Sequence, residues 1–113
     1  MTTTIIASLE KLLDGPRDGA LLRYSLGNEY LKAGDFARAA SRLREAVERD
    51  TGYSAAWKLL GRALSESAQP AEALAAYEQG IAVAEARGDI QAAKEMRVFA
   101  RRLQRQLQAA DGG

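Results

Sequence analysis

The stretch WKLLGRALSESAQPAEALAAY, which runs from Trp57 to Tyr77, decides the fold of this chain. The stretch RYSLGNEYLKAGDFARAASRL, which begins 34 positions earlier at Arg23, has large and small residues at matching places. Identical residues occur in the two copies at Leu26 and Leu60, Gly27 and Gly61, Ala37 and Ala71, and Ala39 and Ala73. A repeat of this period is typical of two-helix units that pack closely and stack on one another.

The order of these residues resembles the tetratricopeptide repeat, with its tryptophan, leucine-glycine, tyrosine, alanine and aromatic positions. The segment SLGNEYLKAGDFARAASRLREAVERD, from Ser25 to Asp50, follows the family pattern and includes its glycine-aspartate turn. Four positions depart from the pattern: Arg23 for the tryptophan, Ala68 for the second turn glycine, and Thr51 and Glu85 for the closing proline. The resemblance covers about residues 20–87 and implies an all-α, right-handed helical-hairpin solenoid of about six helices.

The length of 113 residues predicts one domain, residues 1–113, which can bury about 65% of its unfolded surface. Apolar spacing and helix-breaking residues divide it into an N-terminal docking helix at 4–14, repeat 1 at 20–53, repeat 2 at 54–87 and a C-terminal capping helix at 89–109. Gly34 and Gly88 are predicted to end helices, and Asp35 and Asp89 to cap the next ones. Gly27 lies in mid-helix, where we expect the small face around Ala39 to approach it.

Composition excludes several kinds of chemistry. With no cysteine and no histidine, the chain can build no disulfide, thiol nucleophile, cysteine-histidine zinc site or histidine-based triad. The segment from Gly15 to Gly19 lacks the Gly-Lys-Ser/Thr that would complete a phosphate loop, and the carboxylate pairs are ordinary surface pairs. We therefore predict a protein that is not an enzyme and has no cofactor or metal. Apolar runs are far shorter than the roughly 20 residues that cross a bilayer, and residues 1–6 lack signal-peptide features. A cytoplasmic location is therefore expected.

The resemblance implies a concave groove lined by the first helix of each unit. Its positions are Leu21, Tyr24, Asn28, Leu31 and Lys32 in the first unit and Ala55, Lys58, Arg62, Ser65 and Glu66 in the second. An aromatic ring, an amide and two cations in such a groove could hold a peptide or helix of another protein. The alternative is that these residues are ordinary solvated helix faces, with Arg62 and Glu66 paired one turn apart.

The two-carboxylate clamp, with which some family members grip acidic chaperone tails, is not predicted. Asn28 matches one clamp position, but the other lysine, asparagine and arginine positions hold different residues: Tyr24, Leu59, Asp89 and Ala93. The clamp would therefore lack its cations.

The last helix carries a secondary basic face: Lys94, Arg97, Arg101, Arg102 and Arg105. Such a face could bind an acidic polymer weakly, in a salt-dependent way, or could be a solvated outer surface. Its aromatic residue, Phe99, belongs to the apolar stripe, and the formal net charge is only +1, so nucleic acid and membrane binding are not favoured. Formation of a homodimer through this helix, or a permanent place in a larger assembly, is the remaining alternative.

Overall fold

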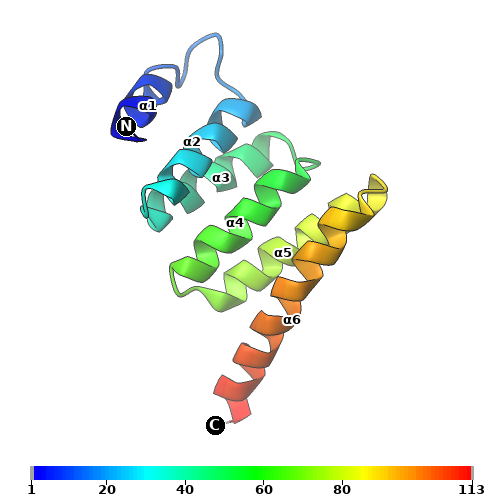
Figure 1. Cartoon of the computed structure of the whole chain (residues 1–113). Helices are drawn as coiled ribbons and strands as arrows, with labels where there is room; N and C mark the ends of the chain where they lie inside the picture. Colours follow the sequence, from blue (N-terminus) through cyan, green and yellow to red (C-terminus); the bar gives the residue numbers. More distant parts are fainter. Residues whose placement is uncertain (1, 113) are drawn as a thin grey trace.

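The computed structural model describes residues 2–112, and within that range the chain forms six α-helices and no β-strand (Figure 1). The helices are α1 (Thr2–Glu10), α2 (Ala20–Lys32), α3 (Phe36–Arg49), α4 (Ser54–Glu66), α5 (Pro70–Ala86) and α6 (Ile90–Gly112). Each helix from α1 to α5 packs on the next, and α4 also contacts both α2 and α6. The predicted all-α class with about six helices is confirmed.

Three of the helix connections use the same tight turn. After α2, the backbone N–H of Asp35 donates to Tyr30 O at 2.9 Å, and the N–H of Gly34 donates to Leu31 O at 3.0 Å. This pair of hydrogen bonds satisfies carbonyls that the helix end leaves free, and it requires a residue in the left-handed backbone conformation. Gly34 and Gly88 have φ values of 78° and 75°, so the predicted helix stops are confirmed.

The predicted helix starts are confirmed as well. The Asp35 side chain accepts a hydrogen bond from Arg38 N at 3.2 Å, and the Asp89 side chain accepts one from Ala92 N at 3.1 Å. Pro70 occupies the first turn of α5, where its missing N–H would have no helical partner.

The turn between α4 and α5 has alanine where the other two turns have glycine. Ala68 is held at φ 58°, between the hydrogen bonds that end α4. A side chain in this conformation costs roughly 1–2 kcal/mol. We expect Ala68→Gly to raise the free energy of unfolding by about 1 kcal/mol, measured by urea denaturation, since glycine removes the strain but adds freedom to the unfolded chain. Gly34→Ala should lower it, and a loss of stability in Ala68→Gly would contradict this account.

The core runs along the stack and combines fully buried leucines with fully buried alanines. Gly27 and Gly61 let large side chains of the following helix lie against the α2 and α4 backbones. A Cβ at Gly61 would lie 2.7 Å from the Tyr77 ring, and one at Gly27 would clash with the Leu43 side chain. The close approach predicted at Gly27 is therefore present, but the neighbour is Leu43 rather than the small face around Ala39.

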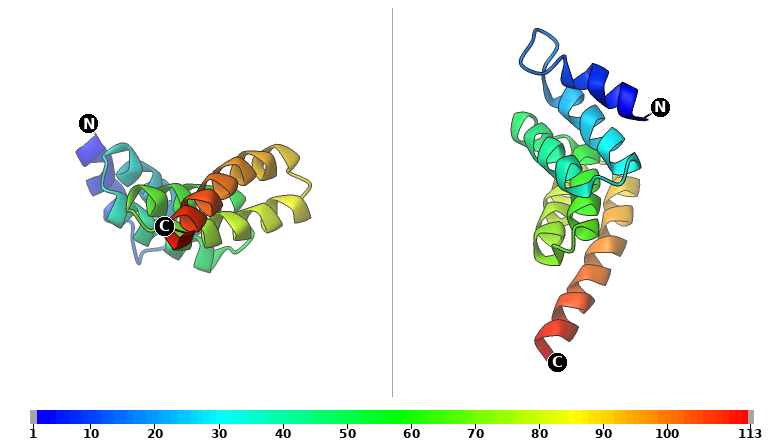
Figure 2. Two further views of the ribbon diagram at one scale, coloured as in Figure 1. Left: turned by 90° about the horizontal axis from the view of Figure 1, so that it is seen from below. Right: turned by 90° about the vertical axis from the view of Figure 1, so that its left-hand side faces the viewer.

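The ends of the chain differ most from the predicted helix bounds. α1 stops at Glu10 instead of residue 14, because the chain turns in short hydrogen-bonded steps through Leu12 and reaches a left-handed Asp14 with φ 65°. α6 continues to Gly112 instead of residue 109. Its C-terminal part projects past the other helices, at the opposite end of the molecule from α1 (Figures 1 and 2). No helix within residues 2–112 has the length and hydrophobicity to cross a membrane.

Candidate functional site

The groove residues predicted on α2 are divided between the surface and the core. Leu21 is 68% exposed, and Lys32 is exposed and forms an ion pair with Glu29 at 3.0 Å. Leu31 is only 6% exposed and packs in the hydrophobic core. Its assignment to the groove is therefore corrected: α2 is covered by α1, α3 and α4, so less of its surface is free than a single two-helix unit suggests.

Tyr24 and Asn28 are half-buried on α2. The Tyr24 ring stacks on Tyr53, with ring centroids 4.8 Å apart and planes inclined by 29°. Burial raises the pKa of the Tyr53 hydroxyl. Sequence reasoning missed Tyr53 because it lies in the link before α4 and not on a helix face. The stack fixes the position of a tyrosine pair beside the α2–α4 boundary.

A pocket of about 470 Å³ lies where α4, α5 and α6 meet. Its lining is formed by Lys58, Leu59, Arg62, Ser65, Glu66, Tyr77, Phe99 and Arg102. The pocket thus unites four of the five predicted groove residues of α4 with Arg102, which the sequence had assigned to a separate basic face. Two aromatic residues also line it: Phe99, which the sequence placed in the apolar stripe of the last helix, and Tyr77 of the repeat pattern. Their helical spacing indicated burial but could not indicate that the packed rings border a cavity.

The aromatic part of the pocket is a stacked pair. The Tyr77 and Phe99 ring centroids are 5.5 Å apart with an interplanar angle of 19°, and the Arg102 guanidinium carbon lies 5.8 Å from the Phe99 centroid. Tyr77 is 3% exposed, whereas Phe99 is 36% exposed. Burial raises the pKa of Tyr77 to about 12, although nearby Arg62 and Arg102 act in the opposite direction. Its hydroxyl therefore stays neutral at physiological pH.

The polar part of the pocket has more cations than carboxylates. Lys58, Arg62 and Arg102 line it, with Glu66 as the carboxylate among the lining residues. Lys58 Nζ bonds Glu95 at 2.7 Å, and this bond together with one from Gln91 lowers the pKa of Glu95. Within the described residues neither Arg62 nor Arg102 forms an ion pair, so the predicted Arg62–Glu66 pair is absent there.

The five residues predicted as one basic face are not equivalent. Arg97 forms an ion pair with Glu85 of α5, and Arg102 lines the pocket. Lys94, Arg101 and Arg105 are exposed on α6. The basic side chains of α6 are thus divided among an interhelical ion pair, a pocket and the outer surface.

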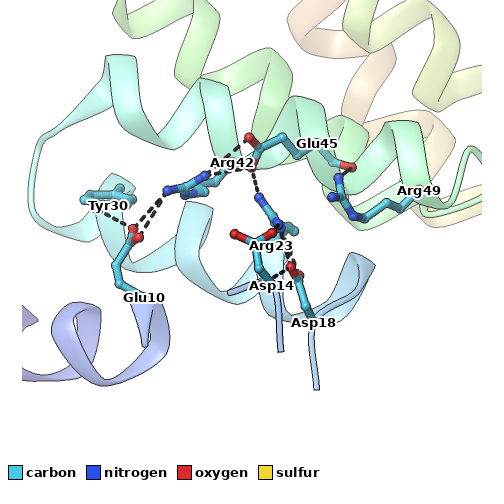
Figure 3. A network of polar contacts seen from close by, with 8 residues as sticks. All are labelled: Glu10, Asp14, Asp18, Arg23, Tyr30, Arg42, Glu45 and Arg49. Carbon is cyan, nitrogen blue, oxygen red and sulfur yellow. Dashed lines mark hydrogen bonds and ion pairs between the residues drawn. The ribbon is translucent and has the colours of Figure 1, made fainter. Parts of the chain in front are cut away.

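A second concentration of charge lies at the other end of the molecule, around Arg23 (Figure 3). The Arg23 side chain is only 7% exposed. Its guanidinium donates to Asp18 at 2.5 and 2.9 Å and to Glu45 at 2.8 Å. Hydrogen bonds from Arg23 and from the Asp14 backbone hold the pKa of Asp18 well below its usual range. The network links the α1–α2 loop to α2 and α3.

The network continues to α1 through Glu10. Arg42 Nη2 bonds this carboxylate at 3.1 Å, and the Tyr30 hydroxyl donates to it at 2.7 Å. Burial alone would raise the pKa of Glu45, but hydrogen bonds from Arg23 and Arg42 outweigh it and lower that pKa. The charged groups of this cluster are paired with one another, which indicates that the cluster holds α1 and the α1–α2 loop in place. Arg23 therefore has a packing role, which its place at the tryptophan position of the repeat did not reveal.

The helices of the described part of the chain, each packed on its neighbour in the sequence, with a pocket where α4, α5 and α6 meet, define a helical-repeat protein. A family model described as tetratricopeptide repeat matches residues 30–96. A TPR repeat-containing protein of Pseudomonas aeruginosa is 52% identical over 101 residues, which cover 89% of this chain and 96% of that protein. The chain therefore belongs to the tetratricopeptide repeat family, whose members are generally non-catalytic modules that bind other proteins.

Two solved structures resemble the fold closely. A solution structure of a Bordetella parapertussis protein is 43% identical, with a TM-score of 0.76, and the match covers 90% of this chain and 89% of that one. A solution structure of a tetratricopeptide repeat domain protein from Salinibacter ruber is 29% identical, with a TM-score of 0.70, and the match covers 80% of this chain and 90% of that one. The helical-repeat arrangement is thus shared with structures of related proteins.

Proposed function

We propose that this chain is an adaptor that holds an extended or helical segment of a partner protein along α2 and α4, against α6. The observation that carries the proposal is the pocket between α4, α5 and α6, which joins predicted groove residues to the capping helix. Clefts of roughly 300–1,000 Å³ with a few convergent polar groups are typical binding sites. The division into two repeat units with a docking and a capping helix, and the cytoplasmic location, are part of this proposal.

Preorganisation would be the source of affinity. The Tyr24–Tyr53 and Tyr77–Phe99 stacks hold four rings in place without a partner. A partner that meets positioned side chains loses less conformational entropy in the complex than one that must order them. Tyr24 and Asn28 would contact one part of the segment, and the pocket would receive another.

The test is capture of proteins from a lysate of the native cells. We expect the wild-type chain to retain a protein that the quadruple variant Tyr24→Ala, Asn28→Ala, Lys58→Ala and Arg62→Ala loses. The matched control changes four exposed residues of α3 and α5 to alanine, namely Arg44, Glu48, Glu72 and Gln79. Both variants must unfold within a few degrees of the wild type, so that a lost partner reports on the surface. Equal capture by wild type and groove variant would contradict the proposal.

The same experiment addresses self-association, the second hypothesis. Ile90 and Val98 are 65% and 51% exposed on α6, and exposed apolar residues of this size favour association when they lie together. Recovery of an untagged copy of the chain itself, equally by wild type and groove variant, would favour that hypothesis. Binding of an acidic polymer by Lys94, Arg101 and Arg105 stays a weaker alternative.

A further inference from the structure

Building on the proposed function, we infer that the pocket between α4, α5 and α6 takes an acidic side chain and an adjacent aromatic side chain from within a partner segment. The proposal specifies the chemistry of the bound segment, whereas the proposed function requires only that the inner surface binds a protein.

The first step is the charge of the pocket. Arg62 and Arg102 come from α4 and α6, and neither has an ion-pair partner within residues 4–111. Arginine guanidinium groups bind carboxylates through paired hydrogen bonds, which makes them selective for that group. Both arginines line the same pocket, so they belong to one site.

The second step is the balance of donors and acceptors. The lining offers donors from Lys58, Arg62 and Arg102, from the Ser65 hydroxyl and from the neutral Tyr77 hydroxyl. The carboxylate of Glu66 is the one negatively charged acceptor that lines the pocket. Lys58 is already engaged by Glu95 at 2.7 Å. A ligand that supplies a carboxylate would complement the two arginines that remain.

The third step is the apolar side of the pocket. Leu59, Tyr77 and Phe99 supply its carbon surface, and Phe99 is 36% exposed. Arg102 lies over the Phe99 ring at 5.8 Å, which leaves its nitrogen atoms able to donate at their edges. An aromatic side chain next to the bound carboxylate would gain contact with this surface. Because the two rings stack on each other, they offer no free pair of faces for successive bases, which favours a protein ligand over nucleic acid.

The test uses the full ¹⁵N-labelled chain and a blocked four-residue peptide that carries phenylalanine followed by glutamate, acetylated and amidated at its ends. We expect saturable NMR shift changes centred on α4 and α6. The matched peptide with glutamine in place of glutamate should bind about tenfold more weakly or worse, because it loses a charge-assisted bond. A third peptide, with glutamine and a free C-terminal carboxylate, tests whether the pocket prefers a side-chain carboxylate or the carboxylate of a chain end.

The variant for this test is Arg62→Gln with Arg102→Gln. It should bind the glutamate and glutamine peptides equally weakly, whereas Arg44→Gln, in an exposed ion pair elsewhere, should preserve the preference. Equal binding of both peptides to the wild type would overturn the proposal. So would a preference for the free chain end, or the absence of saturable changes up to about 5 mM peptide. If those results occur while the groove variant still loses a captured partner, the pocket chemistry is wrong but the proposed function survives.

Discussion

Replacement of Arg23 by methionine is expected to lower the free energy of unfolding by about 3–5 kcal/mol. The Arg23 side chain is 7% exposed and is bonded to Asp18 and Glu45, whose side chains are 11% and 31% exposed. Methionine would fill similar space but would leave Asp18 without its cation and Glu45 with Arg42 as its remaining ion-pair partner, in a place that water reaches poorly. The measurement is urea denaturation followed by circular dichroism.

Arg44→Met is the matched control. Arg44 also joins two helices through an ion pair, with Glu72 at 3.2 Å, but its side chain is 49% exposed. We therefore expect a loss of less than about 1 kcal/mol. Similar losses in the two variants would show that the Arg23 network has no special role in stability.

Acid should reduce the difference between wild type and Arg23→Met. The pKa values of Asp18 and Glu45 are lowered in the folded protein. A lowered folded pKa gives stability that is present above the unfolded pKa and is lost as pH falls toward the folded value. As pH falls below about 5, the wild type should thus lose stability more steeply than the variant, which has already lost the bonds to Arg23. The loss should continue below about pH 3, because the folded pKa of Asp18 lies well below its usual range.

Replacement of Met96 by alanine is expected to lower the free energy of unfolding by about 2–5 kcal/mol. Met96 is fully buried, and its sulfur lies against Gly80 of α5, where a Cβ would be only 2.5 Å away. The shorter side chain would leave a cavity that the rigid glycine contact cannot close. Urea denaturation again provides the measurement, and the slope of the transition should stay unchanged.

The control for this prediction is Leu107→Ala. Leu107 is half-buried on the projecting part of α6, so we expect less than about 1 kcal/mol. Two separate transitions in Met96→Ala would contradict the view that α6 is part of the cooperative core, and would mean that one wall of the pocket can detach. A single, shifted transition would agree with that view.

The helices could be predicted because local signals agree with packing. Asp35 and Pro70 mark helix starts by chemistry that acts over one turn, and α3 and α5 begin there, at Phe36 and Pro70. The predicted C-terminal end of α1 was wrong by four residues, because the bonds of Glu10 to α2 and α3 fix where the chain turns. Long-range contacts of this kind leave no periodic signal.

The candidate site was predictable in part, for a related reason. Residue spacing placed Lys58, Arg62, Ser65 and Glu66 on one side of α4, and that side lines the pocket. Spacing on α6 could not tell which basic side chain turns toward α4, so Arg102 was grouped with the outer face. Likewise, the burial of Leu31 depends on how many helices cover α2, which only the assembled fold determines.

The two ends of the stack are held by different mixtures of contacts. α1 packs through its partly buried Ile6 and Leu9 and is fastened by bonds of Glu10 to Tyr30 and Arg42, whereas α6 is fastened by buried apolar residues such as Met96 and Leu103. Salt weakens partly exposed ion pairs but not apolar contacts. At raised ionic strength, α1 should therefore unfold locally before the helices that line the pocket. Amide exchange and proteolysis should then begin at α1, while the pocket helices stay protected from both.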